Sequence, residues 1–100
     1  MSQFHLKYRF TAKPWRYNGP NGWWFLSLPN ELSLEIRSSF KDLEEGWGRL
    51  PATAVIGSVE WKTAIWFDSK QGTYLLPLKA DVRSKIGEDW QNELDVEVRI

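Results

Sequence analysis

Two pairs of residues in the second half of the chain have types and spacings that suit a ligand site: Trp61 with Thr63, and Lys79 with Arg83. Residues two apart lie on the same face of a strand, and residues four apart are neighbours on one side of a helix. An indole wall, a hydroxyl group and two cations are the groups that bind a small anionic or aromatic compound, or the surface of a partner protein. We therefore take these four residues as the candidate ligand-binding site.

A plainer interpretation of the two cations stays open. Lys79 and Arg83 would then be solvated, or paired with a carboxylate such as Asp81 or Glu60. Two cations in the first turns of a helix oppose its macrodipole, which favours anions there. A bound carboxylate or phosphate between them would relieve that conflict, so the sequence leaves both interpretations in place.

Most catalytic chemistry is excluded by residue counts. The chain has no cysteine and a single histidine, His5. This excludes thiolate nucleophiles, disulfides and Cys-ligated metals, and it leaves no His-based triad or His-rich metal site. We predict no catalytic residue, no metal and no cofactor. An enzyme remains a third alternative, in which Lys79 is buried beside Arg83 and acts as the nucleophile.

The charge balance bears on the choice of partner. Thirteen Lys and Arg residues are matched by thirteen Asp and Glu residues, whereas nucleic-acid-binding proteins usually carry a basic surplus. Nucleic-acid binding is therefore the second alternative, and it would use a basic stripe of Lys7, Arg9, Lys13 and Arg16. The aromatic content is high, with seven Trp, three Tyr and five Phe, and we expect some Trp side chains to line a ligand pocket while others fill the core.

Strands are predicted by hydrophobic alternation and by turn residues. Alternation over residues 4–12 and 94–100 predicts half-buried strands. Residues 23–28 are apolar enough to predict a strand buried on both faces. Strands are also predicted over residues 52–56 and 59–67, separated by a tight turn or bulge at Gly57 and Ser58, and over residues 73–76 after a hairpin loop at residues 68–72.

Two helices are predicted by a four-residue apolar spacing. Residues 31–40 form the first, with Asn30 as its N-cap. The second follows Pro77 and ends near Gly87. Each helix follows a strand that closes with Leu-Pro, so the chain has a possible internal pseudo-duplication. The sequence thus predicts one mainly β domain over residues 1–100, a small closed or double-split barrel of about six strands with two short helices.

The location of the protein is predicted from what its sequence does not contain. The first residues have no secretory signal pattern, and no apolar run approaches the ~20 residues that span a bilayer. A cytoplasmic location follows as the default expectation. The oligomeric state is left open, although Trp47 and Trp90 are candidates for interface anchors or for lids over the core.

One stretch resembles a known family. Ile56-Gly57, Trp61-Lys62-Thr63 and the run from Gly72 to Arg83, with its Leu-Pro-x-Lys-x-x-Val-Arg core, are similar to a family of small bacterial and archaeal domains of unknown function. The resemblance spans nearly the whole chain. It implies a double-split β-barrel related to AbrB-type regulators and antitoxins, and in some members a second domain of a bacteriocin-protection type. It implies no activity, and it supports the same four candidate residues.

The chain departs from the family pattern at three places. Ala64 stands where the family has Ser, and Asp68 stands where it has Pro. A Gly-Asp pair before the last strand is replaced by Glu93-Leu94, with residues 88–92 as an apparent insertion. If that pair shapes a site in the family, the site is altered in this protein.

Overall fold

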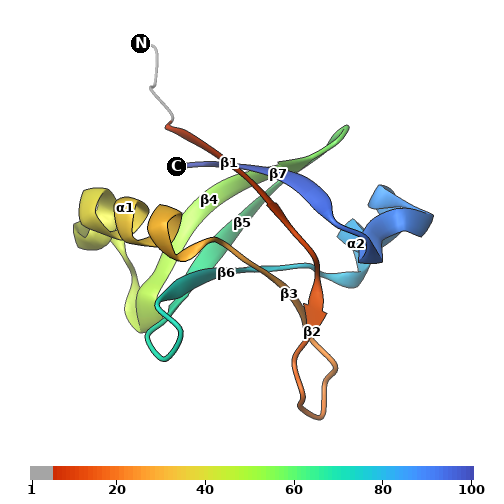
Figure 1. Cartoon of the computed structure of the whole chain (residues 1–100), viewed down its shortest axis with the longest axis horizontal. Coiled ribbons are helices and arrows are strands. Elements are labelled where there is room, and N and C mark those ends of the chain that lie inside the picture. Colours follow the sequence, from red (N-terminus) through yellow and green to blue (C-terminus); the bar gives the residue numbers. More distant parts are fainter. Residues whose placement is uncertain (1–5) are drawn as a thin grey trace.

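The fold is a single curled sheet of seven strands that carries a helix at each side (Figure 1). The structure is a computed structural model and describes residues 6–100. The strands are β1 (Lys7–Ala12), β2 (Trp15–Arg16), β3 (Trp24–Ser27), β4 (Arg49–Ile56), β5 (Val59–Asp68), β6 (Thr73–Pro77) and β7 (Leu94–Arg99). The helices are α1 (Asn30–Phe40) and α2 (Ala80–Ile86).

The sheet is a half-barrel that does not close. Its order is β1-β7-β4-β5-β6-β3-β2, and every neighbouring pair is antiparallel. The two edge strands, β1 and β2, follow one another in the chain through Lys13 and Pro14 but do not pair. The predicted mainly β class and the two helices are confirmed. The closed alternative for the predicted barrel is wrong, the double-split alternative stays a prediction, and the short strand β2 raises the strand number to seven.

The strands form where apolar and polar residues alternate. In β1, Tyr8 and Phe10 are buried, and in β7 the buried residues are Leu94, Val96 and Val98. Phe4 and His5, the predicted start of the first strand, lie outside the described residues. The tight turn at Gly57 and Ser58 is confirmed, since Ile56 pairs directly with Val59 and Gly57 has a φ of 60°.

The core lies inside the curl and is closed at its ends by the two helices. Its fully buried side chains include Leu26, Leu50, Ile65, Tyr74 and Leu76, which come from four strands. On α1, Ile36 is fully buried while Leu32 and Phe40 pack against the core, as the four-residue spacing predicts. On α2, Val82 is the buried residue. Apolar burial of this kind is the main stabilising contribution to the fold.

The predicted N-cap role of Asn30 is wrong. The helix begins at Asn30 itself, and no side chain caps it. Instead, the Asn30 Nδ2 group donates to the carbonyl oxygens of Gln71 at 2.9 Å and Gly72 at 3.3 Å, in the turn between β5 and β6. The Asn30 side chain therefore joins the start of α1 to that turn. The predicted end of the second helix is confirmed, because α2 stops before Gly87, whose φ is 102°.

The two strand–Pro–helix units lie in a reciprocal arrangement. Strands β3 and β6 are neighbours, and α1 and α2 leave the sheet on opposite sides (Figure 1). The Leu28 N–H donates to the Tyr74 carbonyl at 2.9 Å, and the Leu78 N–H donates to the Trp24 carbonyl, also at 2.9 Å. This exchange is the relation expected of two units about a local two-fold axis. Their origin by duplication stays a prediction.

The two tryptophans considered as interface anchors have different surroundings. Trp90 lies in the 3₁₀ turn Glu88–Gln91, where its ring meets that of Trp24 edge-on at 4.7 Å. It is therefore a lid over that end of the core. Trp47 is 92% exposed and has a φ of 67°, a backbone conformation that a residue with a Cβ atom rarely adopts.

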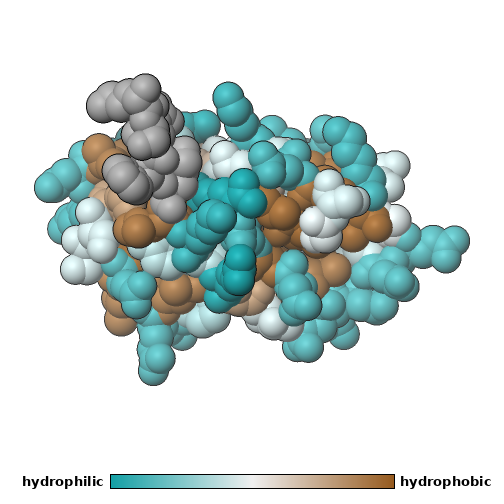
Figure 2. Space-filling model, turned by 90° about the horizontal axis from the view of Figure 1, so that it is seen from above, coloured by the Kyte–Doolittle hydropathy of each residue, from teal (hydrophilic) through white to brown (hydrophobic). Residues whose placement is uncertain are grey.

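The outer face of β1 and β7 carries a charge cluster. The Arg9 Nε donates to Glu97 Oε1 at 2.9 Å, and the Arg99 Nε donates to Glu97 Oε2 at 2.5 Å. These hydrogen bonds hold the pKa of Glu97 below its ordinary value, and the one from Arg99 has the larger effect. Figure 2, which views the molecule from above, shows hydrophilic residues across the middle of this side and hydrophobic surface on either flank.

The Glu97 cluster predicts a pH dependence of stability. Because the pKa of Glu97 is lowered in the folded state, its contribution is present above the unfolded value of about 4.3 and is lost as the pH falls through the folded pKa. We expect Glu97→Gln to reduce the loss of stability between pH 7 and pH 3, measured by urea unfolding. Glu93→Gln, on an exposed residue before β7, is the control. Equal pH dependence in wild type and Glu97→Gln would contradict the prediction.

Candidate functional site

The main hollow of the molecule opens where β5 and β6 separate. The two strands pair only from Trp66 to Asp68 on β5, whereas β4 pairs with β5 over the whole range from Val59 to Trp66. Continuing the β5–β6 register would place Pro77 opposite Ala64. Because proline has no N–H group, it cannot donate to the Ala64 carbonyl. The strands diverge there, and a groove of about 850 Å³ lies in the gap.

The groove has an aromatic and aliphatic wall and a polar rim. The apolar side chains are those of Trp23, Phe25, Trp61, Trp66, Leu75 and Pro77. The polar side chains are those of Arg49, Lys62, Thr63, Lys79, Asp81 and Lys85. Its volume lies within the ~300–1,000 Å³ of small-molecule sites, which combine apolar walls with a few polar groups.

Three of the four predicted site residues line this groove. Trp61 and Thr63 come from β5, and Lys79 precedes α2. Arg83 does not line it. Its guanidinium lies 5.0 Å from the centre of the Trp90 ring, and its Nε is buried with no hydrogen-bond partner among the described residues. Lys79 lies just before α2, which begins at Ala80, and Lys79 and Arg83 both border a separate, smaller hollow of about 240 Å³.

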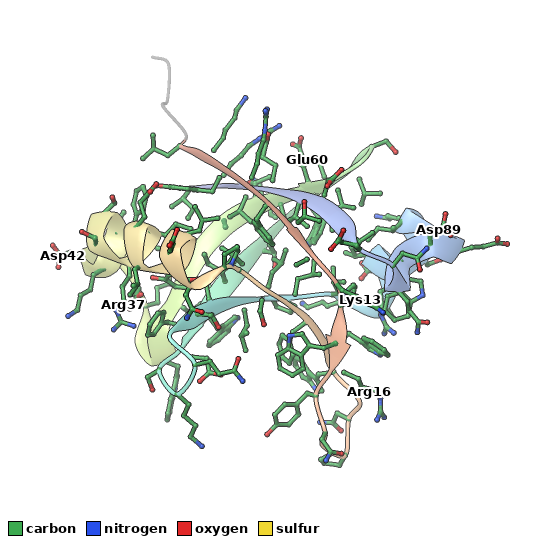
Figure 3. The ribbon with its side chains drawn as sticks, in the orientation of Figure 1. Lys13, Arg16, Arg37, Asp42, Glu60 and Asp89 are labelled. Atoms are coloured by element: carbon green, nitrogen blue, oxygen red, sulfur yellow. The ribbon has the colours of Figure 1, made fainter. Side chains whose placement is uncertain are left out.

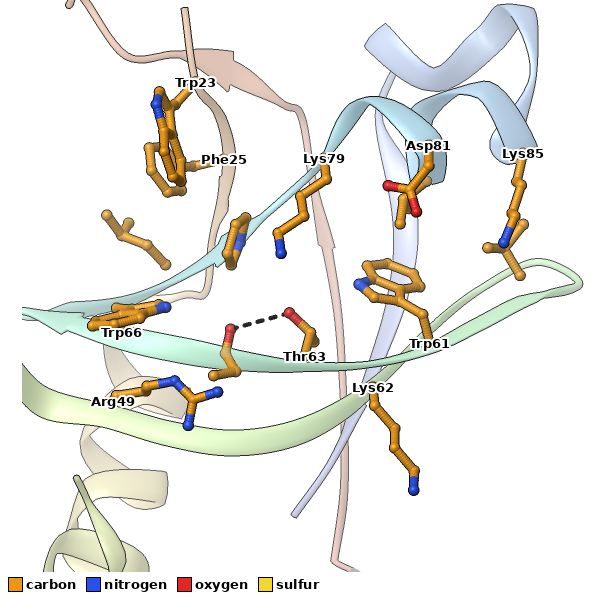
Figure 4. Close-up of a pocket in the computed structure, with 15 residues that line it drawn as sticks. Trp23, Phe25, Arg49, Trp61, Lys62, Thr63, Trp66, Lys79, Asp81 and Lys85 are labelled. Carbon is orange, nitrogen blue, oxygen red and sulfur yellow. Dashed lines mark hydrogen bonds between the residues drawn. The ribbon is translucent and has the colours of Figure 1, made fainter. Parts of the chain in front are cut away.

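The position of its side chain distinguishes Lys79 from the other cations of the groove. Figure 4 shows the Lys79 side chain reaching into the groove toward the Thr63 hydroxyl, whose hydrogen-bond partner is the Ala64 carbonyl oxygen. These two oxygens are joined by a long hydrogen bond of 3.5 Å, in which Thr63 Oγ1 is the donor. The side chain of Lys62 points away from this centre (Figure 4). Lys79 is therefore the cation that an anion in the groove would meet.

Positive charge predominates on the rim. Among the described residues, no ion pair involves Lys79, Lys85 or Asp81. Arg49, another cation that lines the groove, is paired with Glu45 at 2.5 Å. Lys79 is exposed. The burial beside Arg83, on which a nucleophilic Lys79 would depend, is therefore not found.

The sequence interpretation missed the contribution of β3. Residues 23–28 were expected to be buried on both faces, and this expectation is wrong. Leu26 and Leu28 are buried, but Trp23 is 50% exposed and Phe25 is only partly buried. The strand is one-sided, with aromatic residues on its outer face. The signal was Ser27, the one polar residue of this stretch, which shares a strand face with Trp23 and Phe25.

Phe25 is the centre of an aromatic cluster beside the groove. Its ring lies 5.4 Å from that of Trp15, 6.4 Å from that of Tyr17 and 6.3 Å from that of Trp23, measured between ring centres. Trp23 and Phe25 are nearly parallel, at 18°. The Trp15 Nε1 donates to the Ser27 hydroxyl at 2.8 Å, which fixes that indole. The cluster extends the apolar wall from the groove to β2.

The basic stripe considered for nucleic acid is only partly free. Arg9 is held by Glu97 at 2.9 Å. Lys13 lies between β1 and β2, and Arg16 is the last residue of β2 (Figure 3). Within residues 6–100 no group of three or more His, Cys, Asp or Glu side chains is placed to hold a metal ion. None of the helices in that range is both long and apolar enough to cross a membrane.

The fold and the groove define a small, mainly β protein with an aromatic, basic cleft between two diverging strands. The sequence matches the family model of a domain of unknown function, DUF1905, over residues 10–98. The chain belongs to this family. No curated protein matches it significantly. The resemblance found from the sequence is thus confirmed as a domain of unknown function, while the AbrB-type relation and the bacteriocin-protection partner stay predictions.

Proposed function

We propose that this protein is a non-enzymatic binding module whose groove takes a small anionic ligand with a flat apolar body. The observation that carries the proposal is the position of Lys79. Its side chain has no ion-pair partner among the described residues and reaches into a groove walled by Trp61, Trp66 and Phe25. Aromatic walls take the flat body of a ligand, and a cation at their centre takes its charge.

A titration with a matched pair of compounds tests the proposal. Naphthalene-2-acetate has the required anion and flat body, and naphthalene-2-acetamide is its neutral counterpart. We expect calorimetry to show binding of the acid and much weaker binding of the amide. At a hundred times its Kd, the acid would stabilise the protein by about 2.7 kcal/mol, a rise in Tm of about ten degrees or more.

Lys79→Met and Lys62→Met form the matched variants. Both lose one positive charge from a residue that lines the groove, but only Lys79 reaches into it. A hydrogen bond to a charged group is worth about 1.5–3 kcal/mol, so Lys79→Met should weaken acid binding roughly 10- to 150-fold. Lys62→Met should change it by less than about threefold. Equal binding of acid and amide, or equal effects of the two variants, would contradict the proposal.

A further inference from the structure

The groove follows the edge of a strand. Its lining includes Trp61 and Thr63 from one face of β5 together with Lys62, Ala64 and Trp66 from the other. Successive side chains of a strand point to opposite faces. A hollow that touches both faces must therefore run along the edge between them.

The main-chain groups at that edge can be assigned from the register. Ile56 and Val59 close a two-residue hairpin turn, so the N–H and C=O groups of Val59 point toward β4. Those of Trp61 and Thr63 point the same way, because the direction alternates along a strand. The groups of Glu60, Lys62 and Ala64 point away from β4, toward the gap.

No neighbouring strand pairs with the outer part of this edge. The β5–β6 ladder stops at Trp66, and within residues 6–100 no backbone hydrogen bond joins Glu60 or Lys62 to the chain that follows β6. Pro77 has no N–H group for the Ala64 carbonyl, whose one side-chain donor in the described part of the chain is Thr63 at 3.5 Å. Unpaired edges of this kind are templates for another strand, and Lys62 does not cover this one, since its side chain turns away (Figure 4).

We propose that the ligand is a short extended peptide with a free C-terminal carboxylate, an inference that rests on the proposed function. Its main chain adds to the β5 edge at Lys62 and Glu60, as in recognition by strand addition. Its carboxylate meets the ammonium group of Lys79. Side chains that alternate along the peptide contact the apolar wall at Trp61 and Trp66. The unpaired edge explains the main-chain contacts, and the unpaired cation explains the choice of a free carboxyl end.

Three versions of one peptide test the inference. The probe is the acetylated tetrapeptide Val-Thr-Val-Phe with a free carboxyl end, beside its C-terminal amide and a version with N-methyl groups on the Thr and Phe nitrogens. We expect calorimetry to show binding of the free acid. The amide should bind about tenfold or more weakly, and N-methylation should abolish binding, because it removes donors from the added strand.

Amide hydrogen exchange gives a residue-specific readout. On binding of the free-acid peptide, exchange should slow at the Lys62 and Glu60 amides. It should change little at the Trp61 and Thr63 amides, which already point toward β4. This alternation is an internal control, because general stabilisation of the protein would slow all four amides together.

The outcomes separate the peptide from the small ligand. Binding of naphthalene-2-acetate without binding of the peptide, or peptide binding that N-methylation leaves unchanged, overturns the inference and leaves the proposed function in place. Equal binding of the acid and amide peptides overturns the role of the carboxylate. If neither the peptide nor naphthalene-2-acetate binds, both proposals are overturned.

Discussion

Replacing Leu76 by alanine should destabilise the protein by about 2–5 kcal/mol, the cost of removing a large aliphatic side chain from a well-packed core. Leu76 is fully buried in β6 and lies directly opposite Leu26 of β3. The total stability of a domain is about 5–15 kcal/mol, so the loss is a large fraction of it. Thermal unfolding should show a Tm lower by about 10–30 °C, and urea unfolding should give the free energy directly.

Leu75→Ala is the matched control for that prediction. Leu75 is the same residue type one position earlier, but it is only partly buried and lines the groove. Its replacement should cost roughly 1 kcal/mol, as is typical of partly exposed sites, and it should weaken ligand binding, which Leu76→Ala would affect only through stability. Similar destabilisation by the two variants would show that β6 is buried on both faces and would contradict the assignment of its outer face to the groove.

The difference between adjacent leucines shows what the sequence predicts well. Hydrophobic alternation identified β1 and β7, and turn residues identified the β4–β5 and β5–β6 hairpins. These features depend on neighbours in the chain. Trp23 and Phe25 were misjudged because an aromatic residue on an outer face has the same hydrophobicity as one in the core. Only the position of the neighbouring strands separates the two cases.

The openness of the sheet depends on contacts between residues far apart in the chain. β5 is ten residues long, yet it pairs with β6 over three residue positions only. The sequence does contain the cause, because Pro77 ends β6 and lacks the N–H group that the next bond would require. That cause becomes visible only once the β5–β6 register is known. The same gap provides the groove, so the feature that prevents closure also forms the candidate site.

The same limit applies to predicting which candidate residues lie together. Trp61 and Thr63 belong to one strand face, which spacing predicts well. Arg83 was included because four-residue spacing implies a shared helical face with Lys79. However, Lys79 precedes α2 and has an extended backbone. Its side chain therefore follows the direction of β6 into the groove, while Arg83 turns toward Trp90.

Ser33 provides the prediction with the second largest effect on stability. This serine of α1 is fully buried, and its hydroxyl accepts a hydrogen bond from the Tyr74 N–H of β6 at 3.0 Å. It also lies 3.5 Å from the Leu28 carbonyl, to which it donates. Ser33→Ala leaves the Tyr74 N–H buried without a partner, which should cost about 1–3 kcal/mol in urea unfolding. Exchange of the Tyr74 amide should become faster.

Ser38→Ala in the same helix is the control for Ser33. Ser38 is exposed, and alanine is the better helix former, so this change should be neutral or slightly stabilising. Equal stability of the two variants would mean that the Ser33 hydroxyl is not needed where α1 meets β6. A loss confined to Ser33→Ala would instead show that α1 is held by a polar contact in addition to the apolar burial of Ile36. This contact acts on β6, the strand whose far end turns away from β5 to open the groove.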